Sequence, residues 1–363
     1  MRILLATDAW EPQVNGVVRT LTRTVAECRV MGHQVEVVSP DQFKTFPLPT
    51  YPEIKLAVGA YEPVQERFKS FEPEAIHIAT EGPIGLAARR ICVDWKLPFT
   101  TSYHTKFPEY VSARLPLPLS AGYAYMRWFH GPSGRVMVAT PTMRDELAMH
   151  GFRNISPWSR GVDTDAFNPS KATPDVYEGL TRPIWLNVGR VAVEKNIEAF
   201  LALDLPGTKV VVGDGPQREE LAAKYPDVVF RGARFGEDLA AHFACADVFV
   251  FPSLTDPFGL VILEAMASGT PVAAYPAAGP IDIIPNSGAG AVADSLTDGL
   301  REACLACLKL DRAEVRRFAE RFSWRASTEE FVRNLQPYPE PEKTRFWRRL
   351  RRLARLRQRP AQV

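Results

Sequence analysis

Residues 184–196 read IWLNVGRVAVEKN, and this stretch decides how the chain folds. Its first five residues are mostly apolar and predict a buried strand over Ile184–Val188. A glycine follows at once, and two cations, Arg190 and Lys195, stand in the loop that leads toward the next helix. Arginine offers a bidentate fork and lysine a point charge, so the pair can reach one diphosphate. Taken alone, surface cations are the commoner explanation of such a loop.

The same alternation of short apolar runs and longer amphipathic runs extends in both directions from this stretch. In the second half, strands are expected at Ile184–Val188, Lys209–Val212, Val228–Arg231, Val248–Phe251 and Pro271–Ala274, with helices over Pro216–Lys224 and Gly259–Ser268. In the first half, strands are expected at Arg2–Ala6, Gln34–Val38, Ala75–Ile78, Phe99–Tyr103 and Arg135–Ala139, with a helix over Val17–Met31. Short Val- and Ile-rich strands separated by helices predict parallel β-α-β units. The two series therefore predict two doubly wound α/β domains.

The length of 363 residues also suggests about two domains. A polar, Pro-rich stretch over Ile155–Pro183 marks the join, and a second break lies at Gln336–Glu342. We therefore expect an N-terminal domain over 1–160, a linker over 161–183, a C-terminal domain over 184–335 and a tail over 336–363.

Composition places the chain among folded soluble proteins, since 46% of residues are hydrophobic and 24% are charged. The 44 basic and 42 acidic residues leave a net charge of +2, so no global basic field indicates a nucleic-acid partner. No apolar run approaches the roughly 18 residues that span a bilayer, and the N-terminus lacks a signal-peptide pattern. We expect a cytoplasmic protein with free thiols at its five cysteines, Cys28, Cys92, Cys245, Cys304 and Cys307.

Several familiar cofactor motifs are missing. The dinucleotide fingerprint G-x-G-x-x-G does not follow the first strand, and Gly213-Asp214-Gly215 has Arg218 at the position of its third glycine. Hydride transfer is therefore not supported. Asp163-Thr164-Asp165 is a D-x-D motif, but it lies in the Pro-rich join, where turn and capping chemistry is the usual explanation. No other grouping has metal-ligand spacing, so we expect neither a metal nor another cofactor.

A second loop with binding potential follows the strand expected at Val248–Phe251. Asp256 followed by Pro257 predicts a helix N-cap with proline at the first helical position. The amides of Phe258–Leu260 would then face an oxygen-rich ligand. Glu264 lies in an apolar helix, where a carboxylate needs a partner. Sugar hydroxyls would serve, and so would a cation elsewhere in the chain.

Two residues in the first half stand at expected strand ends. Asn15-Gly16 opens a helix after the first strand, and a glycine there permits close approach of the backbone to a phosphate. His104 directly follows the strand expected at Phe99–Tyr103, where a residue facing a cleft belongs. A hydrogen-bonded loop histidine is the commoner occurrence at such a position.

Together and in this order, these motifs resemble glycosyltransferase family 4, a large retaining family, over nine-tenths of the chain. The family's E-x7-E motif has an acidic residue at each end, and here the first is Asp256 and the second Glu264. The subgroup of plant and bacterial glycolipid synthases commonly has this aspartate. The matching segments are Asn15-Gly16-Val17, Tyr103-His104-Thr105, Arg160-Gly161-Val162-Asp163, Gly189-Arg190, Lys195-Asn196, Gly213-Asp214-Gly215-Pro216, Pro257-Phe258-Gly259, Glu264-Ala265 and Gly269-Thr270-Pro271-Val272.

The resemblance implies a GT-B fold, in which two Rossmann-like domains face each other across a cleft. It implies that Arg190 and Lys195 bind the donor diphosphate and that Glu264 holds the ribose hydroxyls. It also implies that His104 contacts the sugar near the reacting carbon, so that His104, Arg190 and Lys195 are the catalytic residues. The remaining donor contacts would come from Gly16 beneath the phosphate, Asp256, and the backbone of Phe258, Gly259 and Leu260.

Charge is concentrated at the C-terminal end of the chain. From Glu340 onward there are nine basic and two acidic residues, a net charge of +7, which leaves −5 for residues 1–339. On a helix, Phe346, Trp347, Leu350, Leu353 and Ala354 would share one side, and Arg348, Arg349, Arg351, Arg352 and Arg355 would fill most of the rest. Such a basic amphipathic helix lies in the plane of an anionic membrane. A solvated tail or a nucleic-acid arm is the alternative.

We therefore expect a retaining glycosyltransferase that is peripheral on the inner face of the cell membrane. It would move a hexose from a UDP-sugar to a membrane lipid, most simply diacylglycerol. The aromatic segment Phe107–Trp128 after His104 would flank the acceptor, unless it is ordinary core. A GDP-mannose-dependent α-mannosyltransferase is the alternative within the class. Outside it stand a nucleotide-sugar epimerase and a non-catalytic lipid-binding module; no nucleic-acid partner is expected.

Overall fold

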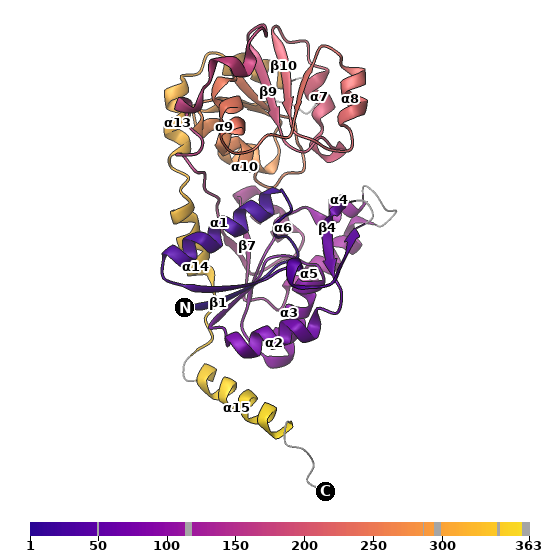
Figure 1. The fold of residues 1–363 in the computed structure, drawn as a ribbon, viewed down its shortest axis with the longest axis vertical. Helices are drawn as coiled ribbons and strands as arrows, with labels where there is room; N and C mark the ends of the chain where they lie inside the picture. Colours follow the sequence, from indigo (N-terminus) through magenta and orange to yellow (C-terminus); the bar gives the residue numbers. More distant parts are fainter. Residues whose placement is uncertain (49–50, 113–117, 286, 294–298, 340–341, 358–363) are drawn as a thin grey trace. The chain divides into compact units, whose positions relative to one another are not determined.

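The computed structural model describes the chain except for residues 49–50, 113–117, 286, 294–298, 340–341 and 358–363. It divides into two compact units. Unit 1 consists of residues 1–138, 144–158 and 328–363, and unit 2 consists of residues 139–143 and 159–327. Each unit contains a parallel six-stranded sheet with helices on both faces, which confirms the predicted pair of doubly wound α/β domains (Figure 1).

The sheet of unit 1 has the strand order β2-β1-β5-β6-β7-β8. Its strands are β1 (Arg2–Ala6), β2 (Gln34–Val38), β5 (Ala75–Ile78), β6 (Thr100–Ser102), β7 (Arg135–Val138) and β8 (Ile155–Pro157). The short edge strand β8 was not expected, because it lies in the Pro-rich stretch assigned to the join. An antiparallel pair, β3 (Thr45–Leu48) and β4 (Tyr51–Ala57), stands apart from this sheet.

Alternate residues of β1 belong to different cores. Leu4 and Ala6 pack with residues of α2 and α3, whereas Ile3 and Leu5 pack with residues of α1 and α14. This alternation follows from the two-residue period of a strand. The helices that contribute to unit 1 are α1 (Gly16–Val30), α2 (Tyr61–Phe71), α3 (Pro83–Trp95), α4 (Phe107–Ser112), α5 (Leu119–His130), α6 (Pro141–Met149), α14 (Trp324–Asn334) and α15 (Glu342–Arg357).

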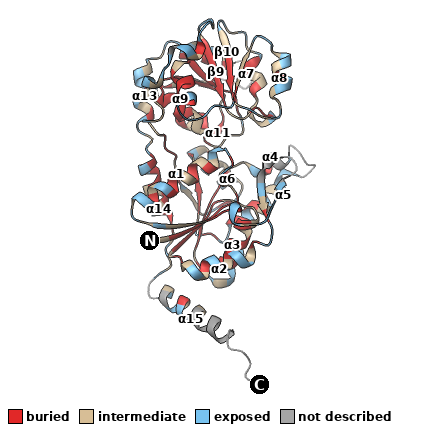
Figure 2. Ribbon diagram, viewed as in Figure 1, coloured by how far each residue is buried: buried red, intermediate tan, exposed pale blue. Residues whose placement is uncertain are grey.

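The sheet of unit 2 has the strand order β11-β10-β9-β12-β13-β14. Its strands are β9 (Ile184–Val188), β10 (Thr208–Val212), β11 (Val229–Gly232), β12 (Val248–Phe251), β13 (Val272–Ala274) and β14 (Gly290–Val292). Every residue of β9 is buried, as a mostly apolar run predicts for a strand covered on both faces (Figure 2).

The helices of unit 2 cover both faces of its sheet. Ile184 and Leu186 pack with α9, α10 and α13, whereas Trp185 packs on the other side with α7, α8 and α12. Cys304 and Cys307 of α12 are buried free thiols, as expected, and burial raises the pKa of Cys307 to about 12. The helices are α7 (Ile197–Leu201), α8 (Arg218–Lys224), α9 (Gly236–Cys245), α10 (Leu260–Ala267), α11 (Ala278–Ile283), α12 (Gly299–Cys307) and α13 (Arg312–Ala319).

In each sheet the first strands in chain order are added toward one edge, and the later strands are then added toward the other edge, so that the strand order reverses once. The reversal lies between β1 and β5 in unit 1 and between β9 and β12 in unit 2. Loops that leave the carboxyl ends of such neighbouring strands diverge and leave a crevice, which is where open α/β sheets bind ligands. The two reversal points therefore locate the candidate site in each unit.

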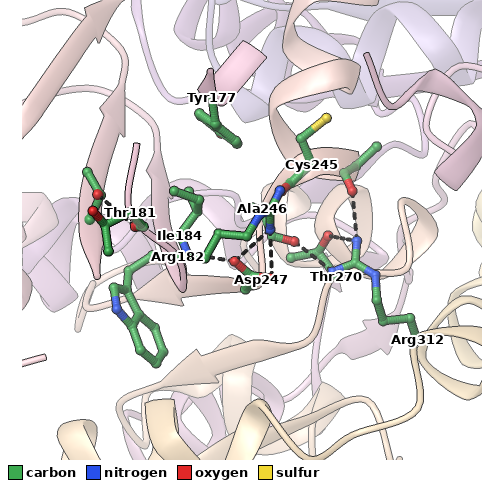
Figure 3. A network of polar contacts seen from close by, with 12 residues as sticks. Tyr177, Thr181, Arg182, Ile184, Cys245, Ala246, Asp247, Thr270 and Arg312 are labelled. Carbon is green, nitrogen blue, oxygen red and sulfur yellow. Dashed lines mark hydrogen bonds and ion pairs between the residues drawn. The ribbon is translucent and has the colours of Figure 1, made fainter. Parts of the chain in front are cut away.

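A polar network lies at the amino ends of β9 and β12, opposite the ends where the reversal point is found (Figure 3). Arg182 donates to both carboxylate oxygens of Asp247 at 2.8 Å, and Asp247 also accepts from the amide of Ile184 at 2.6 Å. Arg312 donates to carbonyl groups at the end of α9 and to Thr270 Oγ1. A cavity of about 510 Å³ adjoins this network. Because their donors are used in this way, the two arginines anchor β9, β12 and α9 rather than form a second anion site.

The units differ from the boundaries expected from the sequence. The segment 161–183 belongs to unit 2, and the chain returns to unit 1 at Thr328. Phe331 and Leu335 of this returning segment pack with Trp158 in the core of unit 1. Periodicity shows that a helix has an apolar face, but it does not show which core that face fills.

The tail also differs from its expected arrangement. Phe346, Trp347 and Leu350 of α15 pack against the core of unit 1 instead of forming an exposed apolar stripe. Leu353, Ala354, Arg351, Arg352 and Arg355 have side chains outside the described part of the structure. Among the described residues, no helix combines the length and the apolar character that crossing a bilayer requires.

Candidate active site

The loops after β9 and β12 meet at the reversal point of unit 2. Lys195 Nζ lies 2.6 Å from Asp256 Oδ1, and their side chains are 26% and 19% exposed. Two further bonds join the same loops: Asn196 Nδ2 donates to the carbonyl of Pro252 at 3.1 Å, and Thr255 Oγ1 donates to the carbonyl of Glu194 at 3.0 Å. The structure thus brings together a cation and a carboxylate that are 61 residues apart in the sequence.

Arg190 stands at the start of the β9 loop, which packs directly on the loop after β10. The amide of Val191 donates to the carbonyl of Asp214 at 2.9 Å. A Cβ added at Gly213 would lie 1.8 Å from the carbonyl oxygen of Gly189, and the φ angle of Gly213 is +152°. Gly213 is therefore required for close packing of the two backbones, which explains a G-x-G that belongs to no dinucleotide fingerprint.

Asp256 does not cap α10, and this expectation was wrong. The helix begins at Leu260 after Gly259, whose φ of +82° breaks the run that Pro257 was expected to start. The carboxylate of Asp256 is instead paired with Lys195. The turn before the helix is closely packed, since a Cβ at Gly279 of α11 would lie 2.0 Å from the carbonyl oxygen of Phe258.

Glu264 lies in α10, and its side chain is buried with a relative exposure of 3%. Every residue from Ile262 to Ala267 of this helix is buried. A carboxylate at such a position is stable only with hydrogen-bond donors or a positive charge directed at it. The burial agrees with the sequence analysis, and the ribose-binding role of Glu264 stays a prediction.

In unit 1, Gly16 is the first residue of α1, next to the carboxyl end of β1. Asn15 caps this helix, accepting from the amide of Val18 at 3.0 Å. Asp8, which precedes it in the loop, accepts from the amides of Ile84 and Gly85 at 2.8 and 3.2 Å. Burial raises the pKa of Asp8 above its ordinary value.

Asp8 thus occupies the N-terminal end of α3 and joins β1 to the element that follows β5. We did not single out this residue from the sequence. Its position directly after the first strand was the available signal, because residues at that edge of a parallel sheet are brought toward the neighbouring loops.

His104 follows β6 and is oriented by residues behind it. Ser102 Oγ lies 2.8 Å from His104 Nε2 and 3.2 Å from Nε2 of the fully buried His77. His77 Nδ1 in turn lies 2.9 Å from Thr100 Oγ1. The ring of Trp158 meets the His104 ring edge-on at 5.6 Å. Sequence reasoning missed Ser102, although its position two residues before His104 was an available signal. It also missed His77, which reaches Ser102 only through the pairing of β5 with β6.

The D-x-D motif at residues 163–165 forms a turn, as predicted. Asp163 Oδ1 accepts from the amides of Asp165 and Ala166 at 3.2 and 2.9 Å. Within the described ranges, no three His, Cys, Asp or Glu residues are grouped so as to hold a metal ion. Metal independence stays a prediction that chelation can test.

Comparison with known proteins agrees with this arrangement of two units. Residues 14–166 match the model described as Glycosyltransferase Family 4, and residues 182–309 match the model described as Glycosyl transferases group 1. A GDP-mannose-dependent alpha-mannosyltransferase of Mycobacterium tuberculosis is 30% identical over 78% of this chain and 81% of its own length. The chain belongs to glycosyltransferase family 4. It is therefore a glycosyltransferase, as the motif order indicated.

Two further relatives are named for transfer of other sugars. Sulfoquinovosyl transferase SQD2 of Arabidopsis thaliana is 29% identical over 89% of this chain and 70% of its own length. Alpha-monoglucosyldiacylglycerol synthase of Streptococcus pneumoniae is 26% identical over 76% and 71%. The chain is thus similar to enzymes with different sugars, and family membership alone does not identify the donor.

Solved structures show the same fold. Sucrose-phosphate synthase from Thermosynechococcus elongatus matches with a TM-score of 0.73 at 19% identity, over 92% of this chain and 97% of that chain. Anabaena HepE, solved in complex with UDP and glucose, matches with a TM-score of 0.68 at 16% identity, over 92% and 98%. These matches identify the fold as GT-B, the fold implied by the family resemblance.

Proposed function

We propose that this enzyme transfers a hexose from a nucleoside diphosphate sugar to a membrane lipid with retention of anomeric configuration. The observation that carries the proposal is the junction of the β9 and β12 loops, where Lys195 and Asp256 lie 2.6 Å apart at the reversal point of the sheet. The junction supplies a cation for the leaving diphosphate and a carboxylate for sugar hydroxyls at the edge where such sheets bind ligands.

In the proposed reaction, the bond between the anomeric carbon and the diphosphate oxygen breaks, and its electron pair leaves with the nucleotide. The acceptor hydroxyl attacks the anomeric carbon on the same face, and its proton passes to the departing phosphate oxygen. Arg190 and Lys195 would stabilise the negative charge that develops on the diphosphate. An ammonium has three N–H donors, so contact between Lys195 and Asp256 is compatible with a second contact to phosphate.

The other residues would position the donor. Glu264, buried in α10, would accept hydrogen bonds from ribose hydroxyls, which would compensate the cost of burying its charge. The backbone of Phe258, Gly259 and Leu260, held by close packing on α11, would contact the sugar. From unit 1, Gly16 would allow close approach of the helix α1 backbone to phosphate, and His104 would contact the sugar near the reacting carbon.

A lipid acceptor is supported by the segment after His104. The segment contributes Tyr123 and Met126 to the core of unit 1, but Phe107 and Trp128 are 43% and 52% exposed. Their rings belong to one chain of contacts through Tyr125, at centroid separations of 6.4 and 5.7 Å. Exposed aromatic side chains of this kind suit the interface between a bilayer and water.

Diacylglycerol with a UDP-sugar is the first candidate pair of substrates. One relative is named as a monoglucosyldiacylglycerol synthase, which favours diacylglycerol as the acceptor, and another is named as a sulfoquinovosyl transferase. The second candidate is GDP-mannose-dependent α-mannosyl transfer, which the 30% identical mycobacterial relative favours. With either donor, we propose that the enzyme works as a peripheral protein on the cytoplasmic face of the membrane.

A donor and acceptor screen tests the proposal. The purified full chain is incubated with UDP-glucose, UDP-glucuronate, UDP-galactose or GDP-mannose and a membrane lipid extract, and mass spectrometry detects lipids that gain a hexosyl unit. The double variant Arg190→Ala, Lys195→Ala is the control and should give no product. Lack of any glycosylated lipid with every donor would overturn the lipid acceptor. Conversion of the donor to an isomeric nucleotide sugar in the absence of an acceptor would indicate the epimerase instead.

A further inference from the structure

The first two turns of α15 have one face against unit 1. Trp347 is only 2% exposed, and Phe346 and Leu350 are partly buried beside it against the same core. Trp95 of α3 contacts both rings, with centroid separations of 5.9 Å to Phe346 and 6.4 Å to Trp347. The apolar face of this part of α15 is therefore covered by the protein itself.

A polar contact holds the same face in place. Lys343 Nζ lies 2.6 Å from Glu74 Oε1, just before β5, and the lysine side chain is 11% exposed. At 100° per residue, Lys343 projects from the same side of the helix as Trp347 and Leu350. An ion pair and an aromatic cluster together bind the helix to α2, α3 and the start of β5.

The opposite face of α15 is basic. Arg345, Arg348 and Arg349 are exposed, and their spacing of three and four residues places them on one side of the helix, away from Trp347. None of the three forms an ion pair with a residue in the described part of the chain. Three guanidinium groups therefore point to solvent from a helix whose orientation is set by its docked side.

We propose that this docked arginine face binds the surface of an anionic membrane by charge alone, without inserting apolar side chains. The inference rests on the proposed lipid acceptor, and it changes how the tail would act. An amphipathic helix that lies in the bilayer buries its apolar face among the acyl chains. Here Phe346, Trp347 and Leu350 already pack against the core of unit 1, and the opposite, exposed face of the helix carries a row of cations.

The chemistry of this face favours lipid headgroups over single-stranded nucleic acid. Single strands are held by bases that stack on aromatic rings. The two rings of α15, Phe346 and Trp347, are turned into unit 1 and are not available for stacking. A plane of phosphate headgroups needs only cations on a surface, which Arg345, Arg348 and Arg349 supply.

The docked helix would also fix the orientation of unit 1 on the membrane surface. Unit 1 contains His104 and the exposed aromatic residues Phe107 and Trp128. Because α15 is bound to this same unit, membrane contact through the arginines would hold the proposed acceptor-binding unit at the lipid surface.

Vesicle flotation with the full chain tests the inference without nucleotide sugar or turnover. Vesicles of phosphatidylcholine with 30% phosphatidylglycerol should carry the protein at low salt, and vesicles of phosphatidylcholine alone should not. Each charge near an anionic surface contributes about a fivefold change in partitioning. The triple variant Arg345→Gln, Arg348→Gln, Arg349→Gln should therefore partition about a hundredfold more weakly.

A matched variant controls for net charge. Arg234, Arg317 and Arg321 of unit 2 are exposed, and replacing all three with Gln changes the charge equally. This control should partition within about threefold of the parent chain. Equal weakening by both triple variants would show that total charge, rather than the α15 face, governs binding, and would overturn the proposal.

Salt separates charge from insertion. Binding by exposed arginines alone should be lost in 0.5 M NaCl, because the Debye length falls to a few ångströms. A fraction that floats at that salt concentration would mean that α15 leaves unit 1 and inserts, contrary to the proposal. Absence of vesicle binding together with tight binding to duplex DNA would also contradict it. Either failure leaves the activity screen unaffected, so the two proposals fall separately.

Discussion

Replacement of Lys195 by alanine tests the role of the junction between the β9 and β12 loops most directly. If the ammonium stabilises the charge that develops on the diphosphate, its loss should cost about 3 kcal/mol of transition-state stabilisation, as for removal of one preorganised donor. That corresponds to roughly a hundredfold decrease in kcat/KM. Steady-state kinetics with the donor identified by the screen would measure it.

The structure predicts that the same change has little effect on folding. Lys195 and Asp256 are 26% and 19% exposed, and at this exposure solvent screens much of their attraction. Such a pair contributes no more than about 1 kcal/mol to stability. A thermal unfolding midpoint within a few degrees of the parent would therefore accompany the large kinetic loss.

A matched control lies elsewhere in unit 2. Lys224 of α8 forms an ion pair with Glu198 in the same unit, and neither residue is among those proposed to contact the donor. Lys224→Ala removes a lysine from an ion pair but should leave kcat/KM unchanged. An unaltered kcat/KM for Lys195→Ala, with the fold intact, would remove Lys195 from the mechanism. An equal loss in Lys224→Ala would show that the effect is not specific to the site.

Three further predictions concern other parts of the molecule. Ser102→Ala should lower kcat about tenfold, because it removes the hydroxyl that positions His104. Thr101→Val removes a hydroxyl from the same strand that contacts His130 instead, and it should not lower kcat. Steady-state kinetics would measure both, and equal effects would refute the positioning role of Ser102. The hydrogen bond from Lys343 holds the pKa of Glu74 below its ordinary value of 4.5. The contact therefore stabilises the docked α15 fully above pH 4.5, and this stabilisation is lost as the pH falls through the lowered pKa of Glu74. The protection of the α15 amides, measured as hydrogen exchange relative to the intrinsic rate at each pH, should then fall in acid, and Glu74→Gln should abolish that pH dependence. Turnover should continue in excess EDTA, and loss of activity that added Mg²⁺ or Mn²⁺ restores would contradict metal independence.

The fold class and the family could be predicted from the sequence because both depend on local patterns. Short, mostly apolar runs such as Ile184–Val188 indicate strands buried on both faces. The burial of Glu264 followed from the apolar helix around it, and the order of the motifs indicated family 4. Each of these signals lies within a few residues of sequence or in the spacing between such segments.

Tertiary structure alone decided which distant groups meet. Asp256 had a plausible local role as a helix cap, but the turn at Gly259 delays the helix and a lysine 61 residues away pairs with its carboxylate. His77 became relevant to His104, through Ser102, only because β5 pairs with β6. A sequence pattern shows that a face is apolar or that a group is charged. It does not show which surface buries the face, as with Trp347, or which partner neutralises the charge, because both depend on contacts between segments far apart in the chain.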